Sequence, residues 1–177
     1  MKVITISGHA QNGKDISAVL ISDALKADNN RVLITHYADL LKYICRTYLG
    51  WNGIKDESGR TLLQSVGTDI VRKKNPDYWV DFTAFILESF YDLWDYVIIP
   101  DTRFPNEITV LKDKGFDVAH LKIVRPGFEN KLTSEQKEHS SETALDNMIP
   151  DYCIKNDGTL KDLSKKLKTW VKESLYE

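Results

Sequence analysis

Cysteine is scarce in this sequence, and so are long apolar runs. The 177 residues contain two cysteines, Cys45 and Cys153, which are too few and too far apart for a zinc knuckle or a disulfide framework. Both stand among apolar neighbours, so we expect two buried free thiols, as is usual in a reducing compartment. No apolar run reaches the roughly 18 residues of a transmembrane helix, so we expect no membrane contact.

An excess of charge of one sign is also missing. The net charge is -2, from 24 lysines and arginines against 26 aspartates and glutamates, which argues against a nucleic-acid-binding protein with a basic face. The first residues form a β-branched stretch, without the charged and apolar regions of a secretory signal, so the expected location is the cytoplasm. The length and the 42% of hydrophobic residues fit a single domain over residues 1–177.

Apolar periodicity predicts strands that alternate with helices. The expected strands are 2–7, 31–37, 95–101, 116–125 and 151–156. The expected helices are 16–28, 38–50, 60–74, 77–93, 105–115 and 159–175. This alternation predicts an α/β fold in three layers, with a five-stranded parallel sheet and helices on both faces. Ligands of such sheets bind beyond the carboxyl ends of the strands.

The loop "SGHAQNGKD" follows the first expected strand. Gly8 and Gly13 allow turns that bring backbone N–H groups toward phosphate oxygens, and the next helix adds the partial positive charge of its N-terminus. Lys14 would reach the β- and γ-phosphates of a nucleotide. Asp15 stands where Ser or Thr usually contacts Mg²⁺. Its carboxylate suits Mg²⁺, directly or through water; the alternative is an acid that only complements the helix dipole.

A second set of candidates follows the third expected strand, in "VIIPDTRFPNE". Asp101 could hold the water shell of Mg²⁺ or accept a proton from an attacking group. Arg103 could bind phosphate with two parallel hydrogen bonds. The alternative is a structural Asp–Arg turn before Pro105.

Polar residues recur at about helical spacing in the segment 59–82: Arg60, Gln64, Thr68 and Arg72. Two arginines and an amide on one face suit a phosphate monoester and the edge of a base, and the alternative is a solvated polar face. Trp79 and Trp94 are expected in the core rather than as base-stacking platforms.

Two further segments are polar. The stretch after Arg125 is a candidate flap, because mobile charged flaps often close over phosphates and exclude water. The stretch "CIKNDGTL" ends the last strand in a turn, which either caps the last helix or borders the adenine of a nucleotide.

Several segments occur in an order that resembles the bacteriophage-type deoxynucleoside monophosphate kinases, within the nucleoside monophosphate kinase-like group of P-loop proteins. They are "SGHAQNGKD", "YADLLK", "RTLLQSVGTDIVR", "YWV", "VIIPDTRFPNE", "HSSE" and "IKNDGTL". The resemblance spans nearly the whole chain and implies a three-layer P-loop NTPase fold with a mobile lid. It implies Mg²⁺- and ATP-dependent phosphorylation of a deoxynucleoside 5′-monophosphate to the diphosphate. It also implies a homodimer.

The same resemblance assigns roles to individual residues. The catalytic residues would be Lys14, Asp101, Arg103 and Arg125. ATP would be bound by Gly8, Gln11, Asn12, Gly13, Lys14, Asp15, Asn156 and Gly158, and the metal by Asp15 and Asp101. The acceptor would be bound by Lys42, Arg60, Gln64, Thr68, Arg72, Trp79 and Glu142. The acceptor-binding helical segment would span 38–93 and the lid 126–142.

The sequence departs from this family at one position, since Ile16 stands where Gly-Lys-Asp-Thr is common. Two other interpretations remain beside the monophosphate kinase. One is a P-loop kinase of another small phosphate acceptor, such as phosphomevalonate or dephospho-coenzyme A. The other is a non-catalytic nucleotide-binding module.

Overall fold

The central sheet has five parallel strands in the order β2-β3-β1-β4-β5, in a computed structural model that describes residues 1–175. The strands are β1 (Lys2–Ser7), β2 (Val32–Ile34), β3 (Tyr96–Ile99), β4 (Asp117–Val124) and β5 (Tyr152–Lys155). The predicted parallel sheet is therefore confirmed. Four of the strands are shorter than predicted, because residues at both ends of each predicted strand belong to the adjoining loops.

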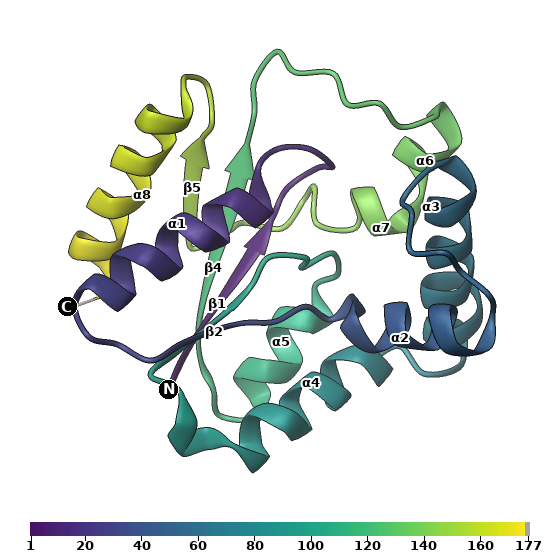
Figure 1. Cartoon of the computed structure of the whole chain (residues 1–177), viewed down its shortest axis with the longest axis horizontal. Helices are drawn as coiled ribbons and strands as arrows, with labels where there is room; N and C mark the ends of the chain where they lie inside the picture. The colour runs from purple at the N-terminus through teal and green to yellow at the C-terminus, as the bar shows by residue number, and fades with distance from the viewer. Residues whose placement is uncertain (176–177) are drawn as a thin grey trace.

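Helices cover both faces of the sheet, as predicted (Figure 1). On one face lie α1 (Lys14–Ala27) and α8 (Leu160–Ser174). On the other lie α2 (Ala38–Tyr48), α4 (Tyr78–Ser89) and α5 (Asn106–Asp113). The strand β1 divides its side chains between two cores, with Val3 in the cluster under α4 and Ile4 and Ile6 in the cluster under α1 and α8.

The predicted helix 60–74 consists of two parts. The α-helix α3 (Glu57–Gln64) continues without a break into a π-helical segment, η1 (Ser65–Arg72). The predicted helix 77–93 likewise ends early, because α4 is followed by a short 3-10 turn, η2 (Tyr91–Leu93).

The polar stretch after β4 contains two short helices that periodicity did not predict, α6 (Ser134–Glu138) and α7 (Ser140–Thr143). The side chain of Thr133 caps α6, and Gln136 completes the capping box. The stretch crosses above the carboxyl ends of the strands and places α6 beside α3 (Figure 1). The segment expected to be a lid thus lies over the edge where a ligand would bind.

One of the two cysteine predictions was wrong. Cys45 is buried in the core, but Cys153 is exposed. It lies on the edge strand β5, where its neighbour Ile154 faces α8 and the alternation of a strand turns Cys153 to the opposite face. Among residues 1–175, no helix has the length and apolar character needed to span a bilayer.

The connections around β1 create a crevice at the carboxyl edge. From β1 the chain continues into α1 on one face, whereas from the neighbouring β3 it continues into α5 on the other face. Adjacent strands whose connections leave on opposite faces form the topological switch point at which ligands bind in open parallel sheets. The loop after β1 and the loop after β3 meet there, which brings Lys14 and Asp101 to the same place.

Candidate active site

A cavity of about 490 Å³ lies at this switch point. Its walls come from the phosphate loop, α2, the loop before α3, α3, η1, α4, the loop after β3 and the segment 126–142. Twelve of the residues that the sequence singled out line it: Gln11, Lys14, Asp15, Lys42, Arg60, Gln64, Thr68, Arg72, Trp79, Asp101, Arg103 and Glu142. Residues more than a hundred positions apart thus share one cavity.

The phosphate loop wraps around the buried amine of Lys14. Its Nζ donates hydrogen bonds to the carbonyl oxygens of Gly8 at 2.7 Å and His9 at 3.0 Å. Burial, and then the nearby charge of Arg103, lower the pKa of Lys14 to about 7. Gly8 has φ +137°, and a Cβ there would lie 2.2 Å from the carbonyl oxygen of Ile123, so the loop requires glycine at this position.

Two of the residues predicted to bind ATP support the phosphate loop from behind. Asn12 donates to the carbonyl oxygen of Ile123 at 3.1 Å, and Asn156 donates to the carbonyl oxygen of Asn12 at 3.0 Å. Gly158 directly precedes Thr159, whose side chain caps α8. The segment therefore caps α8, and its predicted place beside the adenine of a nucleotide stays a prediction.

Arg125 lies on the outer side of the same loop. Its guanidinium stacks on Phe128 at 4.0 Å and donates to the carbonyl oxygen of Gln11 at 3.5 Å. It does not line the large cavity of residues 1–175, unlike the other residues predicted to be catalytic. If Arg125 contacts a nucleotide from this position, it does so from outside the large cavity.

Asp15 projects into solvent at the start of α1. Its side chain is 87% exposed and lies 3.8 Å from Nε2 of His36. Interaction with His36 lowers the pKa of Asp15 below its usual value, and the same interaction raises the pKa of His36. The hydroxyl of Ser17 donates to the carbonyl oxygen of Gly13 at 2.8 Å inside α1, so it does not take the place of the missing Ser or Thr. Although it is exposed, Asp15 also lines the mouth of the cavity, directly after Lys14.

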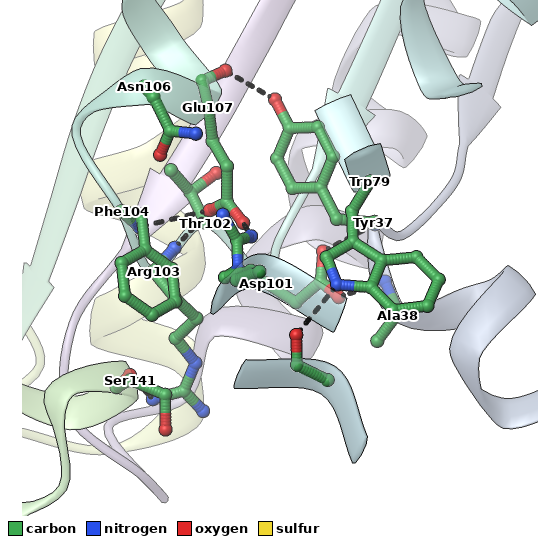
Figure 2. A network of polar contacts seen from close by, with 12 residues as sticks. Tyr37, Ala38, Trp79, Asp101, Thr102, Arg103, Phe104, Asn106, Glu107 and Ser141 are labelled. Atoms are coloured by element: carbon green, nitrogen blue, oxygen red, sulfur yellow. Dashed lines mark hydrogen bonds and ion pairs between the residues drawn. The ribbon is translucent and has the colours of Figure 1, made fainter. Parts of the chain in front are cut away.

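Asp101 fixes the start of α2. Its two carboxylate oxygens accept hydrogen bonds from the backbone N–H groups of Tyr37 and Ala38, each at 3.0 Å (Figure 2). These two bonds hold the carboxylate in place, and its oxygens keep further lone pairs for a ligand in the cavity. The predicted Asp–Arg turn is thus structural and faces the cavity at the same time.

Glu107 forms the other part of this network, and the sequence did not single it out. Its buried carboxylate is paired with Arg72. It also accepts from the backbone N–H groups of Arg103 at 2.6 Å and Phe104 at 3.0 Å (Figure 2). Burial raises the pKa of Glu107 to about 7, while Arg72 and the N–H donors oppose that rise. The hydroxyl of Tyr37 donates to the carbonyl oxygen of Glu107 at 2.6 Å.

Arg72 was expected to bind phosphate but is already occupied by protein groups. Besides Glu107, its guanidinium donates to the carbonyl oxygen of Pro76 at 3.0 Å and stacks over Phe104 at 4.0 Å. Its side chain is only 10% exposed. Trp79 lies nearby, buried as expected, and its indole N–H donates to the carbonyl oxygen of Gly67 at 2.9 Å. This end of the cavity is aromatic, with its charges neutralised.

Arg103 is paired with Glu142 of the segment 126–142, and its guanidinium also donates to the carbonyl oxygen of Ser141 at 3.2 Å. The second carboxylate oxygen of Glu142 accepts from the backbone N–H of Ala10 in the phosphate loop at 3.0 Å. Glu142 thus stands against the phosphate loop, where a phosphate oxygen could take its place. The segment is also joined to η1, since His139 lies 3.5 Å from Asp69.

The four regularly spaced polar residues share one face, and that face lines the cavity: Arg60, Gln64, Thr68 and Arg72. A spacing of four exceeds one α-helical turn but falls short of one π-helical turn. Along α3 these side chains therefore rotate slowly in one direction around the helix axis, and along η1 they rotate back. All four stay on the same face as a result.

Two more cavity residues carried little signal in the sequence. His36 follows the short strand β2, and the sequence analysis did not single it out. Lys55 lies in the polar loop "WNGIKDESG", where no periodicity marks it. The expected strand 31–37 included His36, so its place in the loop after β2 was not predicted.

The cavity fits Mg²⁺ held mostly by water and phosphate. No group of three His, Cys, Asp or Glu side chains in the described part of the chain is arranged to hold a metal ion. Mg²⁺ usually keeps several waters and takes one or two carboxylates together with substrate phosphates, so Asp15 and Asp101 are a sufficient donor set.

Comparisons with known proteins agree with this geometry. The family model of deoxynucleotide monophosphate kinase matches residues 34–167. The deoxynucleotide monophosphate kinase of Enterobacteria phage T4 is 34% identical over 97% of this chain and 68% of its own length. The protein of the same name from Escherichia phage RB69 is 33% identical over 66% of this chain and 46% of its own length.

Solved structures show the same three-layer P-loop fold at low identity. An APS kinase from Mycobacterium tuberculosis aligns with a TM-score of 0.54 and 12% identity, over 97% of each chain. A sugar kinase from Janibacter aligns with a TM-score of 0.58 and 13% identity, over 98% of this chain and 96% of its own. The predicted fold class is confirmed.

Proposed function

The chain belongs to the deoxynucleotide monophosphate kinase family, as the family model and the phage T4 relative show, and we propose that it phosphorylates deoxynucleoside 5′-monophosphates with ATP. One observation carries the proposal: the phosphate loop, the Asp101–Arg103 loop and the polar face of α3 and η1 line one cavity. A donor and an acceptor phosphate can therefore meet between them.

The donor would bind at the phosphate loop. The backbone N–H groups of the loop and the N-terminus of α1 would bind the phosphates, and Lys14 would exchange its bonds to Gly8 and His9 for phosphate oxygens. Arg103 would leave Glu142 for the transferred group, since a guanidinium binds phosphate as well as carboxylate. Both cations oppose the charge on the equatorial oxygens of the transferred phosphoryl group.

The acceptor would lie across the cavity from the phosphate loop. An oxygen of its phosphate attacks the γ-phosphorus of ATP, the bond to the β–γ bridging oxygen breaks, and ADP leaves. We propose that the segment 126–142 closes as a lid and excludes water from this step, because it already contacts the phosphate loop through Glu142. The protein mainly aligns the two phosphates.

Mg²⁺ would be held by Asp15 and Asp101, directly or through water, and would neutralise charge shared by the donor phosphates. The hydrogen bonds from the start of α2 hold the Asp101 carboxylate in a fixed orientation. Asp15, at the start of α1, would supply the hard oxygen ligand that a hydroxyl usually supplies after the loop lysine.

An acceptor panel tests the proposal. The purified chain is incubated with ATP, Mg²⁺ and each of the four deoxynucleoside monophosphates, UMP, phosphomevalonate or dephospho-coenzyme A, and ADP release is followed in a coupled assay. We expect at least one deoxynucleoside monophosphate to exceed both non-nucleotide acceptors by about 10²-fold or more in kcat/KM. Preferred turnover of a non-nucleotide acceptor would point to the other kinase class. ATP binding without any transfer would point to a non-catalytic module.

A further inference from the structure

The charged groups that line the cavity differ in whether they already have a partner. Four of the cations have partners within the protein: Lys14 is bonded to carbonyl oxygens, Lys42 to Asp39 at 2.8 Å, Arg72 to Glu107, and Arg103 to Glu142. Two other cations line the same cavity, Lys55 and Arg60. Within residues 1–175, neither makes a hydrogen bond or an ion pair through its charged group.

Hydrogen bonds and packing hold the loop that carries Lys55 in place at the cavity. Trp51 is buried and its indole N–H donates to the carbonyl oxygen of Ile54 at 3.0 Å, immediately before Lys55. Immediately after it, Asp56 caps α3 by accepting from the N–H of Gly59 at 2.8 Å. A Cβ on Gly59 would lie 2.1 Å from the carbonyl oxygen of Ile54, so the loop packs directly on the helix. The backbone of Lys55 is therefore fixed on both sides.

Lys55 lies across the cavity from Gln11 of the phosphate loop. It lines the large cavity and also a second one of about 260 Å³, and Gln11, Arg60 and Leu132 line both as well. Burial and the neighbouring charges of Lys42 and Arg60 lower the pKa of Lys55, while Asp15 and Asp101 oppose that change. An anion between Lys55 and Arg60 would relieve this repulsion.

We propose that Lys55, together with Arg60, binds the phosphate group of the acceptor and holds it opposite the phosphate loop. The proposal rests on the proposed kinase function and deepens it, because it names the acceptor-phosphate site. It also changes the role expected for Arg72, which is neutralised by Glu107 and belongs to the aromatic end with Phe104 and Trp79. The acceptor would then place its phosphate at Lys55 and its base toward that aromatic end.

The test compares a ligand that has the phosphate with one that lacks it. Calorimetry measures the affinity of the wild type and of Lys55→Met for a deoxynucleoside monophosphate and for the matching deoxynucleoside. We expect the variant to lose about 10- to 100-fold in affinity for the monophosphate, the loss of one charge-assisted hydrogen bond. The affinity for the nucleoside should stay within about twofold, and Lys55→Arg should recover most of the loss.

Steady-state kinetics and a matched control complete the test. In Lys55→Met the KM for the acceptor should rise while the KM for ATP stays unchanged. Lys168→Met is the control, because Lys168 is exposed on α8 and lines neither cavity, so both affinities should stay within about twofold. Equal losses for monophosphate and nucleoside would mean a structural role and would overturn the proposal, as would no loss at all. Turnover by the wild type reports separately on the proposed kinase function.

Discussion

The two ends of the cavity hold their cations in opposite ways. At the end formed by η1 and α5, Arg72 is buried, paired with Glu107 and stacked on Phe104. At the end formed by the loop before α3, Lys55 and Arg60 line the cavity without a partner in the described residues. A cation that is paired with a protein carboxylate helps to hold the cavity wall, whereas a cation without a protein partner is available to a ligand anion. The difference separates residues that shape the site from residues that bind phosphate.

The largest effect is expected at a third place, the phosphate loop. Replacing Lys14 by alanine should lower kcat by about 10³-fold, because a preorganised charge on the transferred phosphoryl group is lost. Circular dichroism should show a folded protein, and Lys26→Ala, an exposed lysine of the same helix, is the matched control. Near-normal turnover of every monophosphate by Lys14→Ala would contradict the assignment of the donor site.

At the end of the cavity where Arg72 is paired with Glu107, the expected effect is on the free energy of unfolding. Replacing Glu107 by glutamine leaves Arg72 buried without a counter-charge, and we expect the free energy of unfolding to fall by about 3 kcal/mol. Urea denaturation measures the change. Asp113→Asn, an exposed acid on the same helix α5, should change it by less than about 0.5 kcal/mol. A neutral effect of Glu107→Gln would mean that the pair does not hold this wall.

Proton uptake on ATP binding tests whether the amine of Lys14 changes its protonation state. Among the protein groups around it, Lys14 has a pKa of about 7, so at about pH 8 the amine is mostly neutral. Phosphate favours the charged amine and raises the pKa, so ATP binding at this pH should take up close to one proton. Calorimetry in two buffers of different ionisation enthalpy measures the uptake. The same uptake in Lys14→Ala would assign the proton to another group.

The smallest effect is expected from a conservative change at the paired end. Arg72→Lys keeps the charge but loses the planar stacking on Phe104 and the bond to Pro76, which should cost about 1 kcal/mol of stability. The KM for the acceptor should change less than in Lys55→Met. A larger rise in this KM than in Lys55→Met would mean that Arg72, and not Lys55, binds the acceptor phosphate.

The sequence was sufficient for the features that depend on local patterns. Alternating strands and helices predicted the sheet, and the glycine spacing predicted the phosphate loop around Lys14. The strand-end positions of Asp101 and Arg103 followed from the fold class, because the carboxyl ends of parallel strands meet at one edge.

The remaining features depend on contacts between distant segments. Glu107 looks like an ordinary acid in the first turn of a helix, and only the approach of η1 gives it Arg72 as a partner. Lys55 lies in an aperiodic loop, so no spacing relates it to Arg60. The exposure of Cys153 depends on which face of an edge strand lacks a covering helix.

The most direct test of the kinase assignment is the identity of the products. Phosphorus NMR follows a mixture of the chain, ATP, Mg²⁺ and the deoxynucleoside monophosphate preferred in the acceptor panel. We predict that the deoxynucleoside diphosphate and ADP appear in equal amounts, and that neither appears with Lys14→Ala. Release of inorganic phosphate without a deoxynucleoside diphosphate, or no reaction with any of the four monophosphates, would contradict the account.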